Sequence, residues 1–193
     1  MNYKKKIFHV ENISTEKIAQ KFKTPLYCYS YSKLRNNISV FKKNFKKVNP
    51  LVCFSVKSNS NKKILIEIKK LGLGADVVSK GELMLAIKAG INPKKIVFSG
   101  VGKRSDEISY AIEKNILLIN AESKSEIREI ERIAKIKKRK VQIGIRLNPN
   151  TDAKTLSQIS TGKKENKFGV NEKTFLELIS YCQNSKNINL GCL

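Results

Sequence analysis

Apolar positions along the chain follow two alternating spacings. Short apolar runs such as "PLVCFSVK" (50–57) favour β-strands, whereas longer segments such as 123–139 repeat isoleucine every three residues and favour amphipathic helices. Strand-like and helix-like segments alternate with a period of about 20 to 25 residues, which is typical of βαβ units. The sequence therefore predicts an α/β fold built on a parallel sheet.

Six strands and six helices follow one another in this pattern. The predicted strands are 50–57, 74–79, 94–100, 116–121, 141–149 and 188–193, and the predicted helices are 31–47, 61–72, 81–90, 105–115, 123–139 and 171–184. Upstream of them, 14–23 predicts a short helix and "TPLYCYS" (24–30) predicts a strand. We count five complete strands of the repeating part and the start of a sixth.

The parallel sheet can have one of two architectures, an open doubly wound sheet or a closed (β/α)₈ barrel. No G-x-G-x-x-G or G-x-x-x-x-G-K-[ST] motif follows the first strand, so the nucleotide-binding open sheets lose support. A TIM barrel needs about 250 residues, and the chain has 193. We therefore expect an incomplete barrel that represents the N-terminal part of one.

A lysine ends the first strand of the repeat. Strand alternation places Lys57 on the same face as Cys53 and Ser55, away from the bulkier residues between them. In a barrel that face is the interior, and barrel active sites lie at the carboxyl ends of the strands. A desolvated amine at this position can attack a carbonyl to form a Schiff base, so Lys57 is the candidate catalytic residue.

Two further charged residues lie on predicted strands. Arg146 shares a face with Gln142 and Gly144 and would enter the same barrel mouth, although a structural salt bridge would equally explain it. Asp76 lies within the second strand, where it could pair with the lysine, orient a cofactor, or serve as a strand-end cap.

Composition narrows the function classes. With 40% hydrophobic residues the chain is expected to fold. The formal net charge of +23 would attract polyanions, but lysines are spread over nearly every segment and few aromatics accompany them. We therefore expect no nucleic-acid partner. A single histidine, His9, leaves no material for a histidine metal site or a Ser-His-Asp triad.

The cellular context follows from the cysteines and the N-terminus. The four cysteines form no C-x-x-C pair, which fits reduced thiols. The N-terminus lacks the apolar region of a signal peptide, and no apolar stretch reaches membrane-spanning length. We expect a cytoplasmic protein without a membrane partner.

Several ordered motifs point to one family. "FSVKSN", "GLGADVVSKGEL", "KIVFSGVGK", "IRLNPNTDAKT" and "ISTGKKENKFG" occur in this order, and together they resemble the fold-type III, pyridoxal-phosphate-dependent amino-acid decarboxylases, in particular the diaminopimelate decarboxylase branch. The resemblance implies an incomplete TIM (β/α)₈ barrel of the PLP-binding, alanine-racemase-like type at 31–193. It also implies that 1–30 is an N-terminal segment whose strand at 24–30 belongs to the family's second, β domain.

The same resemblance implies an activity and a site. The family removes a carboxylate from meso-diaminopimelate to make L-lysine, with pyridoxal 5'-phosphate as cofactor, and full-length members form homodimers. Lys57 resembles the lysine that bonds to the cofactor, and Asp76 and Arg146 resemble residues beside it. Glu82 and Lys167 match positions near the site, although helix capping and loop chemistry would also explain them.

The family's later motifs are not found in the chain. These are a His-Ile-Gly-Ser segment, a glycine-rich phosphate loop and a glutamate for the pyridine nitrogen, so we expect this chain to be inactive alone. Two other interpretations stay open at this point. One is another decarboxylase of the same fold type, acting on ornithine, arginine or a carboxylated polyamine, and the other is a non-catalytic barrel that binds pyridoxal phosphate.

Overall fold

The chain forms two compact units. The computed structural model describes residues 1–4, 6–151 and 168–192, and these divide into one unit up to Pro50 and a second from Leu51 onward. Each unit contains its own β-sheet, with three strands in the first and six in the second. The expected domain boundary, after Ser30, differs from this division and stays a prediction.

The first unit is a small antiparallel sheet with two helices. Strand β2 lies between β1 and β3 and pairs with both in antiparallel fashion. Serine side chains cap both helices, since the hydroxyls of Ser14 and Ser30 each accept a hydrogen bond from an amide of the first turn. The elements are β1 (Asn2–Lys4), β2 (Ile7–Val10), β3 (Ile13–Ser14), α1 (Thr15–Phe22), α2 (Tyr31–Asn44) and η1 (Lys46–Val48).

The strand expected at 24–30 is not formed. These residues have no strand assignment and pair with no strand among the described residues. A β-strand is stable only beside a hydrogen-bonding neighbour, and the three strands of this unit pair only with one another. Pro25 also lacks an amide donor for a ladder. Whether 24–30 belongs to a second domain therefore stays a prediction.

The second unit contains the repeating strands and helices expected from the sequence. Its strands are β4 (Cys53–Ser55), β5 (Gly74–Val77), β6 (Ile96–Phe98), β7 (Leu118–Ala121), β8 (Val141–Ile145) and β9 (Ile188–Cys192). Its helices are α3 (Lys62–Lys70), α4 (Lys80–Lys88), α5 (Ser105–Glu113), α6 (Lys124–Ile136) and α7 (Glu172–Gln183), with short 3₁₀ turns η2 (Val56–Ser58) and η3 (Pro93–Lys95). Every neighbouring pair of these strands is parallel.

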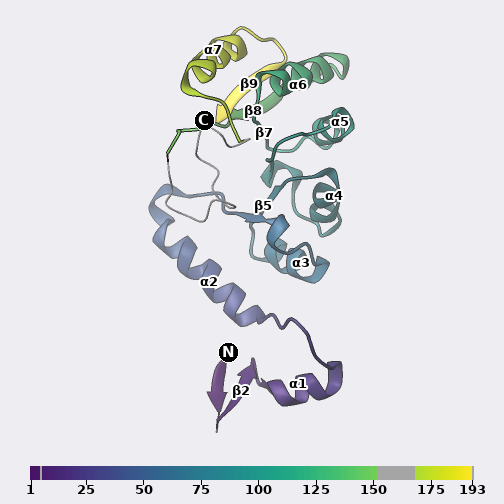
Figure 1. Cartoon of the computed structure of the whole chain (residues 1–193), viewed down its shortest axis with the longest axis vertical. Helices are drawn as coiled ribbons and strands as arrows, with labels where there is room; N and C mark the ends of the chain where they lie inside the picture. Colours follow the sequence, from purple (N-terminus) through teal and green to yellow (C-terminus); the bar gives the residue numbers. More distant parts are fainter. Residues whose placement is uncertain (5, 152–167, 193) are drawn as a thin grey trace. The chain divides into compact units, whose positions relative to one another are not determined.

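Strand order decides between the two ways of closing the sheet. The strands lie side by side in chain order, from β4 to β9, without a reversal. A doubly wound sheet reverses its order at a switch point, whereas a barrel adds each strand beside the previous one. Helices α3, α4, α5 and α6 accordingly follow one another along one side of the sheet (Figure 1). The prediction of a partial barrel is confirmed.

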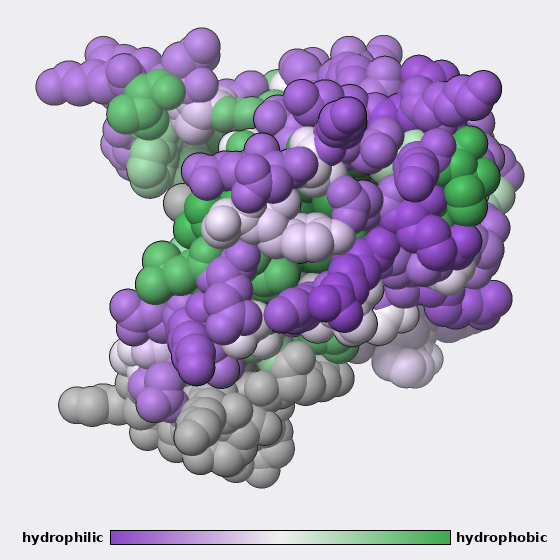
Figure 2. Space-filling view, turned by 90° about the horizontal axis from the view of Figure 1, so that it is seen from above, coloured by the Kyte–Doolittle hydropathy of each residue, from purple (hydrophilic) through white to green (hydrophobic). Residues whose placement is uncertain are grey.

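The core lies between the sheet and these helices. Alternate strand residues such as Ala75, Val77, Ile143 and Ile145 are buried, as are the apolar faces of the helices. Figure 2 shows mainly hydrophilic side chains over the visible face, with smaller hydrophobic patches between them. Gly74 begins β5 at a close approach, because a Cβ there would lie 2.1 Å from the carbonyl oxygen of Lys95. Among the described residues, no helix combines the length and apolar character needed to cross a membrane.

A carboxylate in the first unit predicts a pH-dependent stability. The Ser30 hydroxyl and the Ser32 amide donate to Glu11, at 2.6 and 2.9 Å, and these bonds, that of Ser30 first, lower the pKa of Glu11 to about 2. The bonds therefore stabilise the folded unit fully above the ordinary pKa of 4.5, and this contribution is lost as the pH falls towards 2.

We expect Glu11→Gln to lower the melting temperature at pH 7 and to have a much smaller effect near pH 2, because the wild-type carboxyl loses its charge as the pH falls to its pKa of about 2. Thermal melts over this pH range check the prediction, with Glu16→Gln in α1 as the control. A difference that is the same at both pH values would contradict it.

Candidate active site

Lys57 lies at the carboxyl end of β4, in a turn rather than in the strand. The strand ends at Ser55, and residues Val56–Ser58 form η2. Val56 is fully buried while Lys57 is exposed. Strict alternation therefore does not extend to Lys57, because the chain leaves the strand two residues before it. In the described part of the chain, its amine has no hydrogen bond or ion pair.

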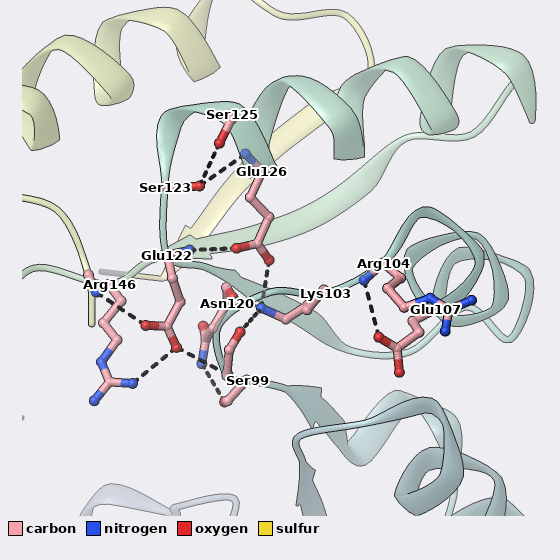
Figure 3. Close-up of polar contacts among 12 residues, drawn as sticks. Ser99, Lys103, Arg104, Glu107, Asn120, Glu122, Ser123, Ser125, Glu126 and Arg146 are labelled. Carbon is pink, nitrogen blue, oxygen red and sulfur yellow. Dashed lines mark hydrogen bonds and ion pairs between the residues drawn. The ribbon is translucent and has the colours of Figure 1, made fainter. Parts of the chain in front are cut away.

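Asp76 belongs to a row of polar side chains that crosses four neighbouring strands. Its carboxylate accepts from the Ser55 hydroxyl of β4, at 3.4 Å, and from the Ser99 hydroxyl after β6, at 2.6 Å. Asn120 of β7 donates its amide to the Ser99 oxygen at 3.1 Å, which Figure 3 shows. The row occupies the face of the sheet opposite the buried residues that pack on the helices. Asp76 is thus held in place from both sides.

The next strand leaves room for this row. Gly144 of β8 pairs with Asn120 in register, and a Cβ at Gly144 would lie 2.4 Å from the side-chain oxygen of Asn120. Glycine is therefore required here by close approach rather than by backbone conformation.

Burial raises the pKa of the Cys53 thiol, and the charge of Asp76 raises it further. This face is thus partly shielded from water around Cys53.

Glu82 caps a helix. Its amide donates to the Ser79 hydroxyl at 3.2 Å, and its carboxylate accepts from the amide of Val78 at 2.9 Å. This reciprocal arrangement begins α4 and is the helix-cap chemistry weighed above for Glu82. Lys167, the other candidate near the site, lies outside the described residues.

Arg146 follows β8 and forms a partly buried ion pair. Its Nη1 donates to Glu122 Oε1 at 3.0 Å, with 38% of the arginine side chain and 3% of the glutamate side chain exposed. Its guanidinium also lies over the ring of Phe168, 4.6 Å from the centroid. Arg146 therefore reaches the same edge of the sheet as Lys57, as expected, and it also makes the salt bridge that was the alternative explanation.

A buried lysine beside this pair binds groups from two neighbouring strand ends. Lys103 Nζ lies 2.6 Å from Glu126 Oε1, with 1% and 8% of the two side chains exposed, and it also donates to the carbonyl oxygens of Gly100 and Asn120, each at 2.6 Å. The other oxygen of Glu126 accepts from the amide of Glu122. Figure 3 shows Lys103 and Glu126 meeting between two loops. All three donor positions of the ammonium group are thereby used.

Sequence reasoning missed the residues that hold the candidates in place. Ser99, Lys103, Asn120 and Glu122 were not singled out, although Ser99 and Lys103 lie within the quoted motif "KIVFSGVGK". Glu122 directly follows a strand, and the strand-end argument applied to Lys57 would have found it. Asn120 carried no signal, because its role depends on the neighbouring strand.

The three main candidates lie towards one edge of the sheet, and no hydrogen bond or ion pair among the described residues joins any two of them. Asp76 is joined to Asn120 through Ser99, whereas Arg146 is joined to the strand end after β7 through Glu122. Lys57 lies at the end of β4 beside this row. The arrangement presents one amine without a partner among the described residues, one fixed carboxylate and one fixed guanidinium on a polar face, which suits the binding of a small, oxygen-rich group carrying a carbonyl.

The buried Lys103–Glu126 pair predicts a large stability effect. We expect Lys103→Met to lower the free energy of unfolding by about 3 to 5 kcal/mol, because it leaves the Glu126 carboxylate buried without its cation. Urea unfolding followed by circular dichroism measures this loss.

An exposed ion pair supplies the control. Lys80 and Asp106 lie 3.0 Å apart with 36% and 48% of their side chains exposed, so Lys80→Met should cost much less than Lys103→Met because water screens the pair. Adding Glu126→Gln to Lys103→Met should recover part of the loss. Equal losses of unfolding free energy in Lys80→Met and Lys103→Met would contradict the prediction, because they would show that burial of the Lys103–Glu126 pair does not affect stability.

Solved structures and curated proteins resemble the chain over most of its length. A diaminopimelate decarboxylase of Helicobacter pylori strain J99 is 49% identical over 170 residues, which are 88% of this chain and 42% of that protein. One of Aquifex aeolicus is 37% identical over 190 residues, 98% of this chain and 45% of that protein. The crystal structure of diaminopimelate decarboxylase from M. jannaschii in complex with L-lysine matches with a TM-score of 0.90 at 34% identity, over 99% of this chain and 46% of that one.

The matches confirm the resemblance seen in the motifs, and they show that the chain spans less than half the length of these relatives. An arginine decarboxylase of Paramecium bursaria Chlorella virus matches with a TM-score of 0.74 at 20% identity and shares the fold. The family model for the pyridoxal-binding domain of pyridoxal-dependent decarboxylases matches residues 31–192. The chain therefore belongs to the pyridoxal-dependent decarboxylases and carries their pyridoxal-binding domain.

Proposed function

We propose that this chain provides the cofactor lysine, Lys57, of a pyridoxal-phosphate-dependent enzyme that decarboxylates meso-diaminopimelate to L-lysine. The observation that carries the proposal is the position of Lys57: an exposed amine without a partner in the described part of the chain, at the carboxyl end of β4. This is the edge at which barrel enzymes bind their ligands.

The residues present fit the cofactor. An amine that bonds to an aldehyde must be accessible and free of competing bonds, which holds for Lys57 as far as the described residues go and fails for the buried Lys103. The adjacent polar row offers a fixed carboxylate at Asp76, and Arg146 offers guanidinium donors at the same edge. Phenolic and phosphate oxygens are suitable acceptors for such donors.

Each residue then has a distinct role. Bound pyridoxal phosphate supplies the electron sink that stabilises the carbanion left when CO₂ departs. Lys57 would hold the cofactor through its Nζ atom. Asp76, kept in place by two serine hydroxyls, would present its carboxylate to the cofactor without reorganising. Arg146 would contribute a fixed positive charge, because Glu122 and the Phe168 ring restrict its guanidinium.

The substrate is inferred from the relatives. Those at 37–49% identity are diaminopimelate decarboxylases, whereas the arginine decarboxylase at 20% identity supports the fold alone. The chain spans under half the length of these relatives, so we further propose that turnover requires groups from the rest of such a protein. A homodimer, a cytoplasmic location and the absence of nucleic-acid or membrane partners complete the proposal. Four free cysteines support the reducing compartment.

Covalent trapping tests the cofactor lysine. We expect that incubating the chain with equimolar pyridoxal phosphate, reducing with borohydride and mapping peptides by mass spectrometry will place most of the label on Lys57. The physical reason is that the neighbouring polar row adds contacts that other exposed lysines lack.

Lys57→Ala should lose this label, and Lys62→Ala, which removes an exposed lysine at the start of α3, should keep it. Label spread evenly over the surface lysines, or unchanged labelling in Lys57→Ala, would refute the assignment.

Decarboxylation is tested in a chimera. We expect residues 1–193 of this chain, joined to the unmatched remainder of the Helicobacter pylori relative, to release CO₂ from meso-diaminopimelate in preference to L-ornithine and L-arginine. The Lys57→Ala chimera should be inactive, and the Lys62→Ala chimera should match the parent.

The 193-residue chain alone serves as the comparison and should show no comparable turnover. Activity of the Lys57→Ala chimera equal to that of the parent would overturn the role of Lys57. A folded chimera without activity on meso-diaminopimelate would overturn the proposed reaction.

A further inference from the structure

Glu122 is a buried carboxylate whose bonds meet at the ends of three strands. It directly follows β7, and only 5% of the residue is exposed. A buried carboxylate is costly unless charges or hydrogen bonds compensate for it. Its Oε1 accepts from the Gly100 amide at 3.1 Å and from Arg146 Nη1 at 3.0 Å, and its Oε2 accepts from the Gly169 amide at 3.2 Å.

These bonds join loops that are distant in the sequence. Gly100 follows β6 and Arg146 follows β8. Gly169 lies more than twenty residues after Arg146 in the sequence. Main-chain bonds fix the arginine itself, because the Arg146 amide donates to Ala121 O and its carbonyl accepts from Val170 N. The backbone of Arg146 is thus anchored by the sheet, and only its side chain needs a further partner to hold one orientation.

Glu122 supplies that partner on one side of the guanidinium. Figure 3 shows the Arg146 side chain running alongside Glu122 from the adjacent strand end. The Phe168 ring covers another side, at 4.6 Å. A guanidinium carries five donors in a fixed planar fork, and 38% of the arginine side chain is exposed. Among the described residues, Glu122 is the only acceptor of a hydrogen bond from this guanidinium, so further donors are available at the candidate site.

We propose that Glu122 is a positioning residue, which orients the Arg146 guanidinium so that its free donors meet an oxygen of the bound cofactor. This inference rests on the proposed function. The Glu122 carboxylate is buried and bonded to the two loops and to Arg146, so its effect on a bound cofactor would pass through Arg146. The charge of the carboxylate matters as well as its shape, because it compensates the cation that it holds.

Glu126 provides a matched comparison. It is a carboxylate in the first turn of α6, the helix that follows Glu122, and its side chain is 8% exposed. It caps α6 and binds Lys103, but no hydrogen bond or ion pair among the described residues joins it to Arg146. Glu126 contacts Glu122 only through the Glu122 main-chain amide, so Glu126→Gln disturbs the same loop network while leaving both side chains of the proposed pair unchanged.

A double-mutant cycle tests the proposal in the full chain. We measure the dissociation constant of pyridoxal phosphate from its absorbance titration for wild type, Glu122→Gln, Arg146→Gln and the double variant. The loss of a charge-assisted contact predicts about ten-fold weaker binding for Glu122→Gln. In the Arg146→Gln background the same change should have little further effect. Glu126→Gln should weaken binding by the same factor in both backgrounds, if at all.

A second readout needs no cofactor. The rate at which phenylglyoxal modifies Arg146, followed by peptide mass spectrometry, should rise several-fold in Glu122→Gln because the guanidinium is released, and it should not change in Glu126→Gln. Urea unfolding of each variant identifies any that fail to fold; for these, Glu122→Asp, which keeps the charge on a shorter side chain, replaces Glu122→Gln.

The outcomes separate this inference from the proposed function. A wild-type chain that takes up no pyridoxal phosphate at Lys57 overturns the proposed function and this inference with it. A wild-type chain that does so, with additive effects of Glu122→Gln and Arg146→Gln or unchanged phenylglyoxal reactivity, overturns this inference alone.

Discussion

Parallel pairing of six strands in chain order is the constraint on which the rest of the structure depends. Each strand joins the sheet beside the one before it, so the helices α3 to α6 lie along one side (Figure 1) and every strand-to-helix loop emerges at one edge. That edge collects Lys57, Asp76 and Arg146 from positions nearly ninety residues apart.

Polar groups at this edge need hydrogen-bond partners within the protein, because they lie above a closely packed core and have limited access to water. Side chains that bond to neighbouring loops provide these partners. Ser55, Ser99 and Asn120 form a row around Asp76, and Lys103 links Glu126 to two carbonyl groups. Unpaired polar groups in such places would be costly, so these bonds give the edge a defined geometry before any ligand binds.

Lys57 is the exception, and the contrast carries functional meaning. Most of the charged groups near this edge have several partners, whereas the Lys57 amine has none among the residues that the structure describes. A lysine that must bond covalently to a ligand cannot also be committed to a structural role. The same comparison applies to Glu82. Its carboxylate already caps α4, whereas the Lys57 amine is available to bind a ligand.

The sequence by itself determined the class of fold, the order of the elements and the motifs of the family, because periodicity and local residue choice encode these directly. It also placed Lys57 and Arg146 correctly at strand ends. It failed for the strand at 24–30, since a strand depends on a neighbour that local sequence does not specify, and it did not foresee that β4 would end at Ser55. Only the tertiary structure decided that Ser99 meets Asp76 and that Glu122 meets Arg146, because both depend on contacts between segments that the chain separates widely.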